Sequence, residues 1–95
     1  MPESAKKRVY EKKFVISNKL GLHARPAALF VQTANRFKCD IEVIKGRQKV
    51  NGKSIMGIMT LAAGMGTSIS VKTTGEDAAL AMEEISKLIG NNFGE

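Results

Sequence analysis

The chain has very few of the residues that build covalent cross-links and metal centres. Its 95 residues include one cysteine, one histidine, two prolines and no tryptophan. Cys39 by itself permits no intramolecular disulfide, and a single histidine with a single cysteine cannot supply the four ligands of a structural zinc site. We therefore expect neither a metal nor a cofactor in this protein.

Long apolar stretches are absent as well. No segment approaches the roughly 20 apolar residues of a membrane span, and the charges at Lys6, Lys7 and Arg8 are not followed by the apolar run of a signal peptide. We expect a cytoplasmic protein without membrane insertion. A chain of 95 residues makes one domain with a modest core and no room for a deep catalytic cleft, so it is typical of a module rather than of a complete enzyme.

Positive charge is in excess, with 15 Lys and Arg against 9 Asp and Glu and a net charge of +6. This excess favours encounters with acidic surfaces, and part of it is concentrated between Lys6 and Lys13. We interpret residues 1–8 as a flexible basic extension and residues 9–95 as a single domain. A small nucleic-acid-binding domain is an alternative, but no basic stretch carries the interleaved aromatic residues that stack on bases.

Apolar periodicity predicts a sheet and helices. Alternating residues indicate strands, and apolar residues at helical spacing indicate helices. The expected elements are a strand at 9–17, a helix at 24–36, a hairpin at 40–51, a short helix at 55–61, a strand at 67–73 and a final helix from Ala78 that stops at Gly90. Two long helices must bury their apolar stripes on the sheet, which favours a two-layer sandwich with the helices on one face.

The only histidine, His23, lies where the first strand gives way to the first long helix. Helix starts favour Ser, Thr, Asp, Asn and Gly, so stability alone does not explain a histidine here. A neutral imidazole is a nucleophile at physiological pH, the helix start offers unpaired N–H groups to an anion, and Arg25 adds a permanent positive charge. These features indicate a phosphohistidine site. The alternative is that His23 is a solvated turn residue and Arg25 an ordinary surface charge.

Ser54 precedes the short helix and is a good N-cap residue, accepting from the backbone N–H of Met56 or Gly57. A phosphoryl group on this serine would lie at a helix N-terminus, which tolerates negative charge, so capping and phosphorylation are compatible.

The short helix carries more apolar surface than one or two turns can bury. We assign Ile58 to the core. We expect Ile55 and Met59, together with Leu22 and Ala24, to form a partner-docking surface beside the histidine.

Two segments resemble a known family. Residues 21–27, GLHARPA, resemble the active-site signature of HPr, the histidine-containing phosphocarrier of the bacterial phosphoenolpyruvate-dependent phosphotransferase system, and residues 51–59, NGKSIMGIM, resemble that family's regulatory serine segment. The resemblance implies an α+β fold, an open-faced two-layer β-sandwich in which a four-stranded antiparallel sheet is covered on one face by two long helices and one short helix (βαββαβα).

The resemblance also implies the function. His23 would accept a phosphoryl group on Nδ1 from enzyme I and pass it to acceptor domains of phosphotransferase components, with Arg25 stabilising the phosphoryl group. The protein would then be a carrier and not an enzyme. Ser54 would be phosphorylated by an HPr kinase/phosphorylase. A monomer is expected, because the carrier must dock several partners through one face.

Two other interpretations remain at this point. The carrier could serve a regulatory branch for nitrogen or carbon signalling without a sugar permease, since the motifs are common to both branches. A domain that only scaffolds other proteins would need no histidine chemistry. A related paralogue of the family that keeps the serine but lacks the histidine is excluded by His23.

Overall fold

The computed structural model describes residues 8–95. Its elements follow the order expected from the sequence: β1 (Val9–Val15), α1 (Ala24–Ala34), β2 (Asp40–Lys45), β3 (Gln48–Asn51), α2 (Ile55–Thr60), β4 (Ser68–Thr74), α3 (Ala78–Gly90) and a short 3-10 turn, η2 (Asn92–Gly94). Apart from Arg8, the basic extension expected at residues 1–8 lies outside the described residues.

The four strands form one antiparallel sheet in the order β1-β4-β2-β3. The last strand in the sequence, β4, therefore lies between β1 and β2. At the centre of the sheet, Val71 of β4 faces Lys12 of β1 on one side and Val43 of β2 on the other. The sheet cannot be complete until residues from both ends of the chain have come together.

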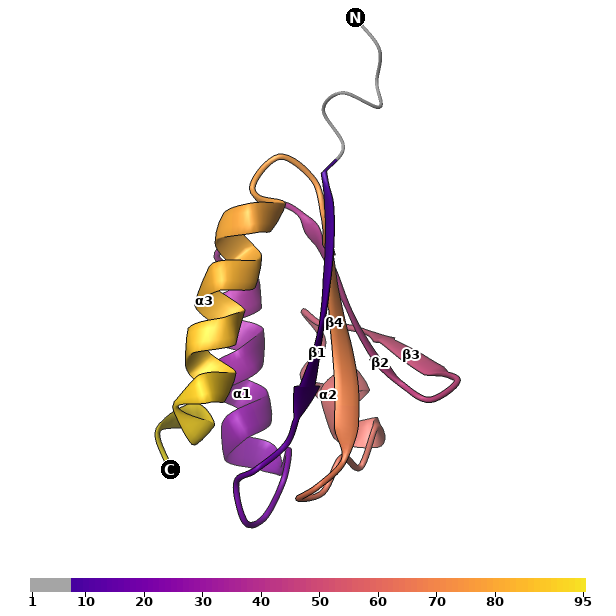
Figure 1. The fold of residues 1–95 in the computed structure, drawn as a ribbon, viewed down its shortest axis with the longest axis vertical. Helices are drawn as coiled ribbons and strands as arrows, with labels where there is room; N and C mark the ends of the chain where they lie inside the picture. The colour runs from indigo at the N-terminus through magenta and orange to yellow at the C-terminus, as the bar shows by residue number, and fades with distance from the viewer. Residues whose placement is uncertain (1–7) are drawn as a thin grey trace, which may run out of the picture.

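The two long helices cover one face of this sheet (Figure 1). Every second residue of β4 is buried beneath them, namely Ile69, Val71 and Thr73, as the alternating pattern predicts. Phe30 of α1 and Ile85 of α3 are 1% and 0% exposed and fill the layer between helices and sheet. The expected open-faced two-layer sandwich is confirmed.

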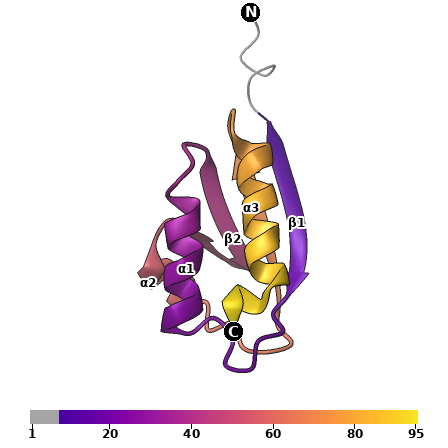
Figure 2. The ribbon, with the colours of Figure 1, turned by 90° about the vertical axis from the view of Figure 1, so that its left-hand side faces the viewer.

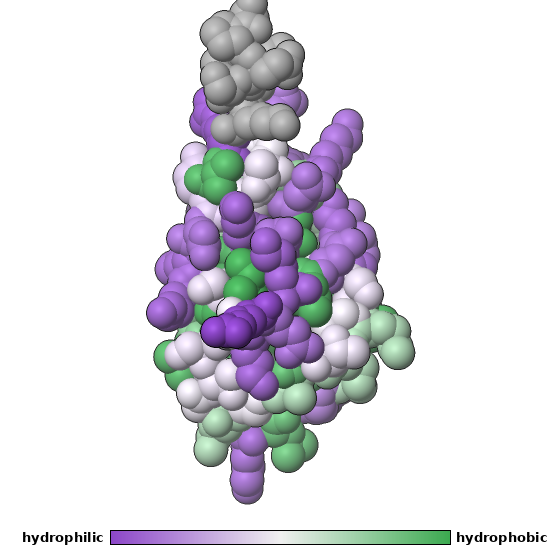
Figure 3. Space-filling model, turned by 90° about the vertical axis from the view of Figure 1, so that its right-hand side faces the viewer, coloured by the Kyte–Doolittle hydropathy of each residue, from purple (hydrophilic) through white to green (hydrophobic). Residues whose placement is uncertain are grey.

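No helix of residues 8–95 covers the other face of the sheet, and Figure 3 looks onto this side, where hydrophilic side chains cover much of the surface. The register places Glu11, Lys72 and Glu42 next to one another across β1, β4 and β2. Alternating charges on neighbouring strands attract one another and keep this face compatible with water.

The short helix α2 contacts α1 and strand β3. Lys45 donates from Nζ to the carbonyl oxygen of Leu61 at 2.8 Å, and Gln48 donates from Nε2 to that of Thr60 at 3.2 Å. These two side chains of the β2–β3 hairpin satisfy carbonyl groups at the end of α2 that have no partner within the helix. The hairpin thus fixes the position of α2.

The end of α1 differs slightly from the sequence prediction, whereas the end of α3 agrees with it. Helix α1 ends at Ala34, with Asn35 as its C-cap, before the predicted end at Arg36. Helix α3 ends at Gly90, as the sequence predicts, with Asn91 as its C-cap.

A short turn after α3 brings the end of the chain to the start of α1. Phe93 has φ +56° and is 3% exposed, so a buried aromatic ring anchors a left-handed turn. Figure 2 shows that the C-terminal end lies beside the loop that leads into α1. The 3-10 turn, which the sequence patterns did not predict, thus places Glu95 near the candidate site.

Candidate functional site

His23 is the N-cap residue of α1. Its backbone is extended, at φ −78° and ψ −170°, and its carbonyl oxygen accepts the first hydrogen bond of the helix from Ala27 at 3.0 Å. The imidazole makes no capping hydrogen bond and its side chain is 36% exposed. The residue thus begins the helix through its backbone, which leaves the ring available for chemistry at the surface.

The loop before His23 is held by a compact set of hydrogen bonds. The backbone N–H of Gly21 donates to the carbonyl oxygen of Asn18 at 3.1 Å, and the next N–H, from Leu22, donates to Ala63 at 2.9 Å. Gly21 has φ +68°, and a Cβ atom on it would collide with the carbonyl oxygen of Ala63. Only glycine adopts this φ without strain and leaves room for the carbonyl oxygen of Ala63. Gly21 therefore fixes the path of the loop that leads to His23.

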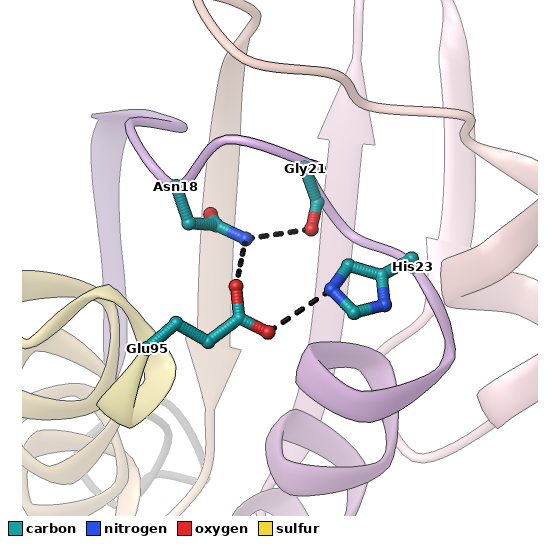
Figure 4. Close-up of polar contacts among 4 residues, drawn as sticks. All are labelled: Asn18, Gly21, His23 and Glu95. Carbon is teal, nitrogen blue, oxygen red and sulfur yellow. Dashed lines mark hydrogen bonds and ion pairs between the residues drawn. The ribbon is translucent and has the colours of Figure 1, made fainter.

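Glu95 contacts the imidazole from the far end of the sequence. Its Oε2 atom lies 3.0 Å from Nε2 of His23, and the side chain of Glu95 is 26% exposed (Figure 4). A carboxylate only accepts hydrogen bonds, so Nε2 carries the hydrogen. In the neutral imidazole the lone pair is then on Nδ1, on the side of the ring away from Glu95.

Asn18 holds the other oxygen of the same carboxylate. Its Nδ2 atom donates to Oε1 of Glu95 at 3.2 Å and to the carbonyl oxygen of Gly21 at 2.7 Å (Figure 4). Sequence reasoning missed both Asn18 and Glu95. Asparagine is common in turns, so Asn18 does not stand out in the sequence. No local pattern connects Glu95 with a histidine 72 positions earlier.

Arg25 and Ala24 occupy the first turn of α1, as the sequence predicts, and both are exposed. No acidic residue stands in that turn, so the unpaired N–H groups of the helix start and the guanidinium group create a positive environment beside His23. Pro26 follows and is buried, at a position where the missing N–H costs no helical hydrogen bond. The arrangement suits an anion.

Ser54 caps α2 as predicted. Its Oγ atom accepts a hydrogen bond from the backbone N–H of Gly57 at 3.0 Å, and the residue is partly exposed. The sequence allowed the backbone N–H of either Met56 or Gly57 as the donor, and in the structure the donor is Gly57.

The apolar residues of α2 divide between the core and the surface. Ile58 is 0% exposed, as expected, whereas Ile55 and Met59 are 39% and 41% exposed. Leu22 departs from the expectation of an exposed docking residue, because it is 5% exposed and packs in the core. Its neighbour Leu20 is 71% exposed.

A shallow depression joins this apolar surface to the histidine. Its lining includes His23, Leu20 and Met59, with Leu22 contributing the little surface it has. The loop before α1 and the helix α2 therefore share one surface beside the imidazole. We call the exposed residues Leu20, Ile55 and Met59 the apolar patch.

Two titratable groups with shifted pKa values lie at the other end of the sheet from His23. Asp77 is the N-cap residue of α3, and Cys39 immediately precedes β2. Backbone N–H donation from Lys38, at 2.8 Å, lowers the pKa of Asp77, and the N–H of Cys39 donates to the same carboxylate at 2.9 Å. Burial raises the pKa of the Cys39 thiol to about 11, with a further contribution from Asp77. These shifts reflect a structural contact distant from His23.

Within residues 8–95 no three His, Cys, Asp or Glu side chains gather closely enough to hold a metal ion. In the same part of the chain, every helix is too short or too polar to cross a lipid bilayer.

The family model and the similar sequences all identify the same family. The family model for the phosphorylation site of the phosphotransferase system component HPr matches residues 10–91. The phosphocarrier protein HPr of Neisseria meningitidis serogroup A is 54% identical over 80 residues, which cover 84% of this chain and 90% of that protein. The HPr-like protein Crh of Halalkalibacterium halodurans is 52% identical over 79 residues, covering 83% and 94%.

Solved structures agree in fold as well as in sequence. The crystal structure of HPr-C-His from Thermoanaerobacter tengcongensis superimposes with a TM-score of 0.88 at 49% identity, and the match covers 90% of this chain and 97% of that one. Since the family model spans most of the chain and the strands, helices and histidine loop lie where the sequence placed them, the chain belongs to the HPr family of phosphocarriers of the phosphotransferase system.

Proposed function

We propose that the protein carries a phosphoryl group on Nδ1 of His23, received from phosphorylated enzyme I and passed to acceptor domains of phosphotransferase components. The observation that carries this proposal is the contact between Nε2 of His23 and Glu95 at 3.0 Å, which leaves the lone pair on Nδ1. The ring is partly exposed and lies in a shallow depression, so two different partners can reach it in turn.

The transfer step needs only positioning and charge. The lone pair of Nδ1 forms the bond to phosphorus while the bond between phosphorus and the donor's leaving atom breaks, and that electron pair leaves with the donor. Nε2 keeps its proton, and the carboxylate of Glu95 stabilises the positive charge that the ring gains. Arg25 and the N–H groups at the start of α1 bind the phosphoryl oxygens.

The test is to incubate the protein with phosphoenolpyruvate, magnesium and a bacterial enzyme I, and to follow its intact mass. We expect the mass of one phosphoryl group to be gained, to be lost in acid, and to be absent from His23→Ala. No gain with an enzyme I that phosphorylates another HPr would overturn the proposal.

Phosphorylation of Ser54 by an HPr kinase/phosphorylase would regulate this transfer. The hydroxyl is partly exposed and lies at the N-terminus of α2, next to Ile55. A phosphoryl group there adds about −1.5 to −2 charges at neutral pH. That charge would repel acidic partner surfaces and would have to be desolvated when a partner covers the apolar patch.

The apolar patch, with the exposed Ala24, is the proposed docking surface for enzyme I and for the acceptors. Ile55 and Met59 expose apolar atoms beside a charged site, which is the usual composition of an interface centre. Leu20 replaces the buried Leu22 of the sequence-based expectation.

A regulatory branch without a sugar permease is the second candidate, supported by the 46% identity to Crh of Bacillus subtilis, which is described as the catabolite repression HPr. Acceptor proteins of the two branches, offered to the phosphorylated carrier, would separate these functions. We propose that transfer uses the monomer in the cytoplasm. Structures of an HPr dimer from Thermoanaerobacter tengcongensis and of a domain-swapped Crh dimer have been solved, so sedimentation analysis is the direct check of the oligomeric state.

A further inference from the structure

Asn18 is one of two buried polar residues within residues 8–95, the other being Thr73, and it contacts the candidate site twice. It is 4% exposed. Its Nδ2 atom uses both hydrogens, one toward the carbonyl oxygen of Gly21 and one toward Oε1 of Glu95. The amide thus joins the loop that delivers His23 to the carboxylate that contacts the imidazole.

The burial of this amide has a cost. The Oδ1 atom of Asn18 is buried without a hydrogen-bond partner among the described residues, and a buried unpaired carbonyl oxygen is unfavourable relative to water. A smaller residue would avoid this penalty. Residues that lower the stability of the fold in this way are concentrated at functional sites, where the function requires them.

The segment that carries Glu95 also depends on unfavourable backbone conformations. Asn92 and Phe93 have φ values of +52° and +56°, which non-glycine residues seldom adopt. Phe93 is anchored in the core and Asn92 accepts a hydrogen bond from Oγ of Ser17 at 2.6 Å. These contacts bring Glu95 to the loop, and the contact from Asn18 then fixes one oxygen of its carboxylate.

We propose that Asn18 is a positioning residue for phosphoryl transfer, because its buried amide holds Glu95 in the orientation that keeps the hydrogen of His23 on Nε2 and the lone pair on Nδ1. With Oε1 bound to Asn18, the second oxygen, Oε2, is directed at Nε2. Without this contact the carboxylate rotates freely in solvent, and the imidazole divides between its two neutral tautomers. Only the tautomer with a free Nδ1 lone pair can form the bond to phosphorus on that atom.

This inference rests on the proposed function, and its first test does not need enzyme I. The ¹⁵N chemical shifts of the imidazole report which nitrogen carries the hydrogen. We expect Asn18→Ala to move the neutral ring toward the tautomer protonated on Nδ1, by about fivefold, the factor that corresponds to one hydrogen bond. Unchanged ¹⁵N shifts in a folded Asn18→Ala protein would overturn the inference.

The second test asks whether Asn18 acts through Glu95. Asn18→Ala should slow phosphorylation of His23 by phosphorylated enzyme I in proportion to the lost fraction of the tautomer with the free Nδ1 lone pair, and should have no further effect in a Glu95→Ala background. Equal slowing in both backgrounds would mean that Asn18 only supports the loop, and would contradict a positioning role.

Two further variants keep the tests interpretable. Asn18→Ser keeps one donor and replaces Asn18→Ala if that protein does not fold, with the same expected non-additivity toward Glu95→Ala. Asn35→Ala removes an exposed amide at the opposite end of α1 and should change neither the ¹⁵N shifts nor the rate. If the wild-type protein takes up no phosphoryl group, the proposed function fails, while the ¹⁵N shifts still decide whether Asn18 sets the tautomer.

Discussion

The Oγ atom of Ser54 accepts a hydrogen bond from the backbone N–H of Gly57 at 3.0 Å, so the hydroxyl proposed for regulation is also the cap of helix α2. A helix of this length depends strongly on its cap, because the N–H groups of its first turn have no partners within the helix. Substitutions at this position therefore affect stability and docking through different atoms, and the two effects can be measured separately.

Ser54→Ala removes the cap and should lower the free energy of unfolding by about 1 kcal/mol. Ser54→Asp keeps an acceptor for the N–H of Gly57 and should leave that free energy nearly unchanged. The aspartate should nevertheless slow phosphorylation of His23, because it adds a negative charge beside the apolar patch. Urea denaturation and transfer rates from enzyme I check the two expectations. Equal transfer rates for Ser54→Asp and the wild type would contradict the regulatory role.

Met59→Asp should slow transfer without unfolding the protein. Met59 is 41% exposed, so a charge there costs little in the free protein but must be desolvated when a partner covers the patch. Leu80→Asp is the matched control, since Leu80 is an apolar residue of α3 that is 52% exposed and lies outside the patch. The KM for the carrier as a substrate of enzyme I is the quantity to compare. Equal increases in KM for both variants would argue against docking through the patch.

The ionisation of Asp77 should make the free energy of unfolding depend on pH in the acidic range. Its pKa is lowered below 3.8 by the backbone N–H of Lys38, so the folded protein binds this proton more weakly than the unfolded chain does. The stabilisation is present above the ordinary carboxyl value and is lost as the pH falls through the lower value of the folded state. Urea denaturation of the wild type and of Asp77→Asn measures this. The variant should lose less stability on acidification than the wild type, and parallel curves would contradict the expectation.

Cys39 should be unreactive in the native protein. The residue is 3% exposed, and burial raises the pKa of its thiol to about 11. Alkylation at mildly alkaline pH should be slow when folded and fast in denaturant, because the thiolate is the reactive form. The unfolded chain releases this proton near the ordinary value of 9.0, so stability should fall as the pH rises from there toward 11. Cys39→Ala should lack that alkaline loss.

Local patterns in the sequence were sufficient for much of the fold and for the two motifs. The alternation in β4 and the spacing of Phe30 and Ala34 report which side of an element is buried, because that depends only on the geometry of a strand or a helix. The positions of His23 and Ser54 at helix starts follow from the same local rules. Each of these features involves residues close together in the chain.

The tertiary structure decided the contacts between residues that lie far apart in the sequence. Leu22 enters the core rather than the surface, because the loop closes onto Ala63. The carboxylate of Asp77 accepts from the segment after α1 instead of capping its own helix. The carboxylate of Glu95 lies against His23 because α3 packs beside α1 and the 3-10 turn at Phe93 brings the end of the chain to the start of α1. The sequence by itself thus determined the candidate histidine and its helix, whereas long-range packing determined which acidic side chain contacts it.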